Sequence, residues 1–244
     1  MLQNAVFGGA FFWGHKKKHQ NPVFLFENEG ITCKWTLDAL TEKESLNAVQ
    51  IALVRHGFHS AQQDKDLTLI GHSFGSFQLT WFLRSGLCNR IDKFILLEPV
   101  SILLSEPDVA LNYVYGRGAD SALVGESFPR SIFIRLFLSS EIFIEHYLRR
   151  HFAWYNSELW LEDIPNHIDT NIYVAEKDQI TDSHKIGIEI KRVNAKRSGE
   201  KNFKPIKLRQ WNGKGHGSCV VLPSLWKEIS HTVRKGKTSL EKVV

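Results

Sequence analysis

The stretch DLTLIGHSFGSFQLTWFL, residues 66–83, constrains the fold more than any other part of the sequence. Its first part is apolar and rich in β-forming residues, which predicts a short buried strand. From Phe74 the apolar residues recur with helical spacing. The change from strand to helix takes place within GHSFG, where Gly71 and Gly75 leave room for a sharp turn. A strand that turns directly into a helix is typical of α/β folds, so the sequence predicts that class.

Short apolar runs alternate with helical patterns along most of the chain, which has 244 residues. One helical pattern opens with Thr41 and Glu44 at capping-box spacing, and another has Pro223 near its start. Because parallel strands are joined by helical crossovers, this alternation predicts one domain over residues 1–244 with a doubly wound, mostly parallel sheet. The further strands are expected at PVFLF (22–26), DKFILLE (92–98), TNIYVAE (170–176) and KPIKLRQW (204–211).

Residues 101–165 interrupt the alternation, because they contain no convincing strand and are helical and rich in aromatic residues. The segment is too long for a plain crossover loop. We predict a helical cap inserted over the carboxyl ends of the strands, although one more core-packing layer would show the same pattern. A cap of this composition would line a pocket with apolar groups and favour a small hydrophobic acyl or ester substrate.

Charge and cysteine content argue against several other classes. The formal net charge is +5, and Lys and Arg are spread along the chain rather than clustered beside a nucleic-acid-binding module. We therefore expect no nucleic-acid partner. Cys33, Cys88 and Cys219 are odd in number and lack metal-ligand spacing, which favours free thiols in a reducing, intracellular compartment. No metal and no cofactor are expected.

The N-terminal segment MLQNAVFGGAFFWGHKKKH holds an apolar stretch that is too short to span a bilayer. It also lacks the basic start and the cleavage site of a signal peptide. We predict one helix here. Its aromatic residues, followed by Lys16–Lys18, could rest on a membrane surface, which keeps a membrane-peripheral location as a weaker alternative.

Ser73 is the candidate nucleophile, because a glycine-flanked serine between strand and helix forms a strained turn that exposes the hydroxyl. A serine hydroxyl is a weak nucleophile unless a base removes its proton. The helix after the turn points its unpaired N–H groups at developing oxyanion charge, and the Phe74 N–H is the expected donor. His72, inside the turn, is expected to support the turn rather than to catalyse.

The base and the acid are expected in the turns after the last two strands. His216 lies in the glycine-rich turn GKGHGS behind the final strand. Asp178 follows the strand before it, where a carboxylate can orient the imidazole and stabilise its cation. The chain order Ser, Asp, His favours Asp178. Asp182 and Glu98 remain alternative acids.

The segments GHSFG, AEKDQI and GKGHGS resemble those of the α/β-hydrolase superfamily, and the resemblance covers most of the chain from about Pro22. The segments LLEPVSILLSEPDVALNYVYG and RRHFAWYNSELWLEDIPNHI are similar to a capped branch of that superfamily in fungi and protists. The resemblance implies a lipase-like serine esterase that uses Ser73, His216 and Asp178 to act on esters or related acyl compounds.

The sequence departs from the superfamily's pattern at the second oxyanion donor. This donor usually follows an earlier strand. If PVFLF were that strand, Glu27 and Asn28 would stand where a His-Gly pair is common. We favour the other interpretation, that PVFLF is the next strand along the chain and leads directly into the helix before the elbow strand, and that the strand bearing the oxyanion loop and those before it are missing. Gly8 and Gly9 are weaker candidates for remnants of that loop. An N-terminally shortened, catalytically impaired binding protein is therefore the alternative function.

Overall fold

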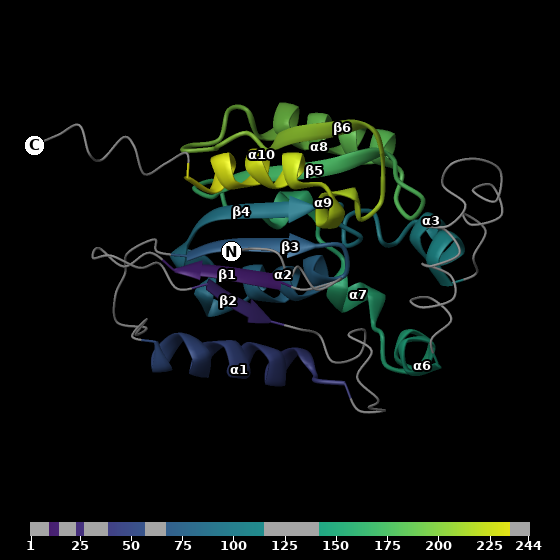
Figure 1. Ribbon diagram of the computed structural model, residues 1–244. Coiled ribbons are helices and arrows are strands. Elements are labelled where there is room, and N and C mark those ends of the chain that lie inside the picture. The colour runs from purple at the N-terminus through teal and green to yellow at the C-terminus, as the bar shows by residue number, and fades with distance from the viewer. Residues whose placement is uncertain (1–9, 15–22, 27–38, 57–66, 115–141, 235–244) are drawn as a thin grey trace, which may run out of the picture.

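Strands from both halves of the chain form one mixed β-sheet (Figure 1). A computed structural model describes residues 10–14, 23–26, 39–56, 67–114 and 142–234. Within these residues the strands lie in the order β2-β1-β3-β4-β5-β6. Their bounds are β1 Ala10–Gly14, β2 Val23–Phe26, β3 Leu67–His72, β4 Ile91–Leu97, β5 Asp169–Lys177 and β6 Lys207–Gly215.

Strands β3 to β6 are parallel to one another, as the alternation of strands and helices predicts. Successive side chains of a strand point to opposite faces of the sheet. In β4, Phe94 and Leu96 pack in one apolar cluster, whereas Ile95 and Leu97 pack in another. All four side chains are buried, which explains why residues 94–97 form a continuous apolar run without polar alternation.

Helices cover both faces of the parallel strands, so the predicted doubly wound sheet is confirmed (Figure 1). Burial of each leucine, isoleucine or valine in these layers stabilises the fold by roughly 1.5–3 kcal/mol. One face is covered by α1 (Glu42–Arg55), α2 (Gly75–Arg84) and α8 (Ser183–Arg197), and the other by α9 (Ser218–Val221) and α10 (Pro223–Arg234).

The prediction of one helix in the N-terminal segment is wrong, because Ala10–Gly14 forms strand β1. This strand pairs antiparallel with β3 on one side and with β2 on the other. Its sequence AFFWG is bulky and aromatic, which favours a strand, and glycines near both ends disfavour a long helix. Pairing with the open edge of β3 satisfies the backbone hydrogen bonds of this short run.

The strand PVFLF is also placed differently from its prediction as a buried strand of the parallel sheet, because it pairs antiparallel with β1. It forms β2 at the edge of the sheet, and β1 lies between β2 and β3. The side chain of Leu25 is 41% exposed, as an edge position permits. The order of elements along the chain could not reveal this arrangement, because the strand that separates β2 from β3 in space precedes both in sequence.

The described parts of residues 101–165 contain short helices and no strand. These helices lie on the side of the molecule toward which β3 and β4 point (Figure 1). Residues 115–141 lie outside the described residues, so the cap boundaries and the single domain over residues 1–244 stay predictions. The bounds are α3 Pro107–Val109, the π-helix η3 Ala110–Val114, α6 Ile142–Arg150, α7 Trp154–Ser157 and the 3-10 helix η5 Leu161–Asp163.

Across the described ranges, no helix combines the length and the apolar character needed to cross a bilayer. The segment Lys16–Lys18, which suggested contact with a membrane surface, lies outside those ranges. A membrane-peripheral location therefore stays a prediction.

Candidate active site

Ser73 occupies a sharp turn between β3 and α2. Its φ angle is 49°, in the left-handed region, which a residue with a Cβ atom adopts at a cost of roughly 1–3 kcal/mol. The Ser73 N–H donates to the Leu97 carbonyl at 2.9 Å, and the Ser76 N–H donates to the Ser73 carbonyl at 3.0 Å. These bonds hold the strained turn from both sides, so the predicted junction of strand and helix is present.

Gly71 allows α2 to pack close behind this turn. A Cβ atom at this position would lie 2.6 Å from Cδ1 of Leu79 and 3.1 Å from the Gly75 carbonyl oxygen. A larger residue would require the Leu79 side chain to move and the Gly75 carbonyl to shift by a few tenths of an ångström. The first glycine of GHSFG therefore favours the close passage that the sequence predicts.

The structure brings together Ser73, His216 and Asp178, which lie far apart in the sequence. Ser73 Oγ is 2.8 Å from His216 Nε2. His216 Nδ1 is 2.8 Å from Oδ2 and 3.0 Å from Oδ1 of Asp178. All three are hydrogen-bond distances. In this arrangement the imidazole can accept the serine proton while the carboxylate holds the other ring N–H.

Asp178 is a buried carboxylate at the end of β5. Its Oδ1 also accepts hydrogen bonds from the N–H groups of Ile180 at 2.8 Å and Thr181 at 3.1 Å. Burial by itself raises the pKa of Asp178, but the contact with His216 and the two backbone bonds lower that pKa more, and it lies below its ordinary value. The carboxylate is therefore ionised at neutral pH and can stabilise a histidine cation.

The two alternative acids have other partners. Asp182 caps the first turn of α8, where its carboxylate accepts from two backbone N–H groups. Glu98 directly follows β4, and its Oε2 accepts a hydrogen bond from the Gly217 N–H at 2.5 Å. Among these three carboxylates, it is Asp178 that lies at hydrogen-bond distance from Nδ1 of His216.

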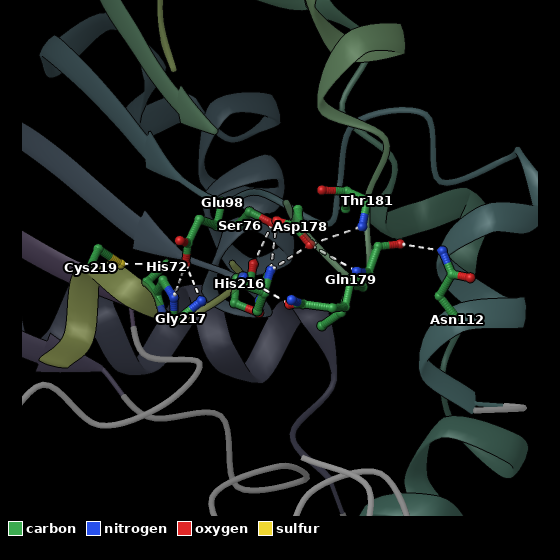
Figure 2. Close-up of polar contacts among 12 residues, drawn as sticks. His72, Ser76, Glu98, Asn112, Asp178, Gln179, Thr181, His216, Gly217 and Cys219 are labelled. Carbon is green, nitrogen blue, oxygen red and sulfur yellow. Dashed lines mark hydrogen bonds and ion pairs between the residues drawn. The ribbon is translucent and has the colours of Figure 1, made fainter. Parts of the chain in front are cut away.

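Side chains from the ends of two neighbouring strands hold the loop that carries His216 (Figure 2). The His216 N–H donates to Gln179 Oε1 at 3.1 Å, while the Gly217 N–H donates to Glu98. A Cβ atom at Gly215 would lie 2.6 Å from Gln179 Nε2, so a glycine there allows the amide to approach. Gln179 is a site residue that the sequence patterns do not predict, although its position directly after the predicted acid is a signal for it.

His72, Glu98 and His216 bring possible metal-ligand atoms within 4.8 Å of one another. These atoms already take part in hydrogen bonds. His72 Nε2 lies 3.1 Å from Glu98 Oε2, and the two ring nitrogens of His216 face Ser73 and Asp178. The cluster therefore fits a hydrogen-bonded network better than a metal centre, and His72 contacts Glu98 rather than the serine hydroxyl.

The Phe74 N–H is the backbone donor that directly follows Ser73. Within the described ranges it donates to no other group, and it lies at the N-terminus of α2, where the helix dipole favours negative charge. It is thus available to an oxyanion. The residues considered for a second donor, Gly8–Gly9 and Glu27–Asn28, lie outside the described residues.

An apolar cluster lies beside the serine and joins α2 to α6. The ring of Phe74 packs edge-on against Phe77, with centroids 4.6 Å apart, and lies 5.9 Å from the ring of Phe152. Because Phe74 directly follows Ser73, these rings place apolar surface next to the candidate nucleophile. The buried members of the cluster are Phe74, Phe77, Val100, Ile144, Tyr147 and Ile180.

Comparison with protein-family models gives no match, and neither does comparison with curated protein sequences. Solved structures do match. The chain aligns with the esterase RhEst1 from Rhodococcus sp. ECU1013 at a TM-score of 0.50 and 14% identity, covering 88% of this chain and 80% of that one. It aligns with the peroxisomal α/β-hydrolase Lpx1 from Saccharomyces cerevisiae at a TM-score of 0.50 and 15% identity, covering 87% of this chain and 66% of that one.

These likenesses, together with the sheet order, show that the chain has the α/β-hydrolase fold. The chain spans 66% of the length of Lpx1 and 64% of the length of a thermophilic esterase from Thermogutta terrifontis. One fold can carry many activities, so the chemistry of this protein has to follow from the residues of its site.

Proposed function

We propose that this protein is a serine hydrolase that cleaves carboxylic esters or lipid-like acyl compounds through an acyl-enzyme. The observation that carries the proposal is the hydrogen-bonded chain from Ser73 through His216 to Asp178, with a distance of 2.8 Å at each link. A serine becomes an effective nucleophile when a base lies within hydrogen-bond reach and a third group orients that base. Both conditions are met.

In the first half-reaction, Ser73 Oγ attacks the acyl carbon of the ester while its proton moves to His216 Nε2. Asp178 stabilises the imidazolium through the Nδ1–H. The carbonyl oxygen becomes an oxyanion, which the Phe74 N–H is placed to bind. The bond to the alcohol oxygen then breaks, and His216 gives its proton to that oxygen as the alcohol departs.

In the second half-reaction, a water molecule attacks the acyl-enzyme and transfers a proton to His216 Nε2. The tetrahedral intermediate collapses and breaks the bond to Ser73 Oγ. This oxygen regains its proton from His216, and the carboxylic acid leaves. The site then returns to its starting protonation state.

Two observations support a hydrophobic acyl group. The apolar cluster around Phe74 lies next to the nucleophile and includes Ile144 and Tyr147 from α6. In addition, RhEst1, which shares the fold, is an esterase.

Labelling of the purified chain with a fluorophosphonate tests the proposal. We expect labelling of the wild type and of Ser198→Ala, a control variant at an exposed serine, and none of Ser73→Ala. Turnover of short p-nitrophenyl esters should follow the same order. If Ser73→Ala were labelled to the same extent as the wild type, the assignment of Ser73 as the nucleophile would be refuted. A folded wild-type chain with neither labelling nor turnover would instead favour a catalytically impaired binding protein.

A further inference from the structure

Glu98 is a buried carboxylate that the proposed mechanism does not use. It is 0% exposed, and its φ angle of 48° lies in the left-handed region. Its Oε2 accepts a hydrogen bond from the Gly217 N–H at 2.5 Å and lies 3.1 Å from His72 Nε2 and 3.5 Å from Cys219 Sγ. Three donors from β3, the histidine loop and α9 therefore converge on one oxygen (Figure 2).

This placement is unfavourable for stability. Within the described ranges no hydrogen bond reaches Glu98 Oε1, although the atom is buried. A buried polar atom without a partner costs about 1–3 kcal/mol, and the left-handed backbone adds roughly 1–3 kcal/mol. A well-packed uncharged residue would avoid these two costs, although it would also lack the three contacts of Oε2. The charge of Glu98 therefore points to a role beyond packing.

The role follows from the segment that Glu98 contacts. Gly217 directly follows His216, and its φ angle of 74° marks the point where the chain turns into α9. Glu98 binds the N–H of Gly217, and Gln179 binds the N–H of His216. Two successive peptide groups of the histidine loop are thus held from the ends of β4 and β5, while Asp178 holds the ring itself.

We propose that Glu98 is a positioning residue, which fixes the histidine loop through the Gly217 N–H and stabilises the imidazolium form of His216 by its negative charge. This inference rests on the proposed serine-hydrolase function, in which His216 carries the proton. Glu98 itself exchanges no proton in the reaction.

Titratable groups approach His216 from several elements. Asp178 contacts the ring from the end of β5, the ring of His72 in β3 lies 5.9 Å away, and Cys219 of α9 lies behind Glu98. Burial raises the pKa of Glu98, but its bond with His72 and the charge of His216 lower that pKa more, and it lies below its ordinary value. Because charge interactions are mutual, ionised Glu98 favours protonation of His216.

Glu98→Gln tests this role, because glutamine keeps the length of the side chain and an acceptor for the Gly217 N–H but removes the charge. The base must be neutral to accept the serine proton, so kcat/KM falls at acid pH as His216 becomes protonated. Without the Glu98 charge, the acidic limb of the profile should move to lower pH by about 1 unit. Because a neutral amide oxygen binds the Gly217 N–H less strongly than a carboxylate does, the histidine loop should also be held less firmly, and kcat should fall about tenfold to a hundredfold with a much smaller change in KM.

Two further variants separate charge from position. Glu158→Gln is the matched control, because Glu158 is also buried, at 1% exposure, and accepts its hydrogen bonds from Ser105 instead of the histidine loop. Its pH profile should match that of the wild type. Glu98→Asp keeps the charge on a shorter side chain, so kcat should fall while the acidic limb stays in place. A wild-type kcat in Glu98→Asp would overturn the positioning role.

An NMR titration of the His216 ring in 15N-histidine-labelled protein gives a second readout that needs no turnover. The titration midpoint should fall in Glu98→Gln and stay unchanged in Glu158→Gln. Equal midpoints and equal acidic limbs in Glu98→Gln and the wild type would overturn the charge effect. If the fluorophosphonate does not label the wild type, the proposed hydrolase function fails, and the NMR midpoint still decides whether Glu98 acts on His216.

Discussion

Replacing Asp178 by asparagine should hold His216 in the wrong tautomer. The N–H groups of Ile180 and Thr181 bind Oδ1 of Asp178 at 2.8 and 3.1 Å. In Asp178→Asn they would hold the amide oxygen, so the NH2 group would take the place of Oδ2, which lies 2.8 Å from His216 Nδ1. Nδ1 must then accept a hydrogen bond, and the ring proton moves to Nε2, where it faces Ser73 Oγ.

A protonated Nε2 cannot accept the serine proton, so kcat should fall by about 10⁴, which corresponds to about 5.5 kcal/mol of lost transition-state stabilisation. The variant should remain folded, because asparagine keeps the shape and the two backbone bonds. Initial rates of p-nitrophenyl butyrate hydrolysis measure kcat, and circular-dichroism melts check the fold. A folded variant that loses less than about tenfold in kcat would refute the tautomer reasoning. A larger loss in Glu98→Gln than in Asp178→Asn would reassign the acid to Glu98.

Three further outcomes are expected. Gly71→Ala should lower the free energy of unfolding by about 1–3 kcal/mol, because the new Cβ would lie 2.6 Å from a leucine side chain of α2; an unchanged Tm would contradict this. The pKa values of Asp178 and Glu98 lie below their ordinary values of 3.8 and 4.5. At pH values above these ordinary values each ionised carboxylate stabilises the folded state, and this stabilisation is lost as the pH falls through the folded-state pKa. Urea midpoints should therefore fall in acid, less steeply in Glu98→Gln, and equal slopes in variant and wild type would argue against this contribution. Gly215→Ala should displace Gln179, since the added Cβ would lie 2.6 Å from its amide nitrogen, and kcat should fall while fluorophosphonate labelling persists; a wild-type kcat would speak against the contact.

The parallel sheet and the three candidate catalytic residues leave local patterns in the sequence. Ser73, Asp178 and His216 each follow a predicted strand, and the carboxyl ends of parallel strands meet at one edge of a sheet. The order of the residues along the chain then assigns a role to each one. Sequence reasoning could therefore predict this arrangement, and the structure places the three side chains at hydrogen-bond distance.

The remaining features depend on contacts between distant parts of the chain. Strand β1 is too short to favour one conformation by itself, and its pairing with β3 decides that it is a strand. Glu98 and Gly217 lie 119 residues apart, and no local pattern links a carboxylate behind one strand to a peptide N–H behind another. The sequence predicts Glu98 only as an alternative acid, because its contact with the Gly217 N–H depends on how the end of β4 packs against the histidine loop.

The candidate base follows β6, one of the two edge strands of the described sheet. β6 pairs with β5 on one side, and no strand of the described chain pairs with its other side, whereas Ser73 and Asp178 follow inner strands. Edge segments open locally at a lower free energy than the centre of a sheet. Such an opening would carry His216 away from an otherwise intact serine turn. The opening equilibrium measured by amide hydrogen exchange in β6 would then give the fraction of folded molecules in which His216 is displaced from Ser73.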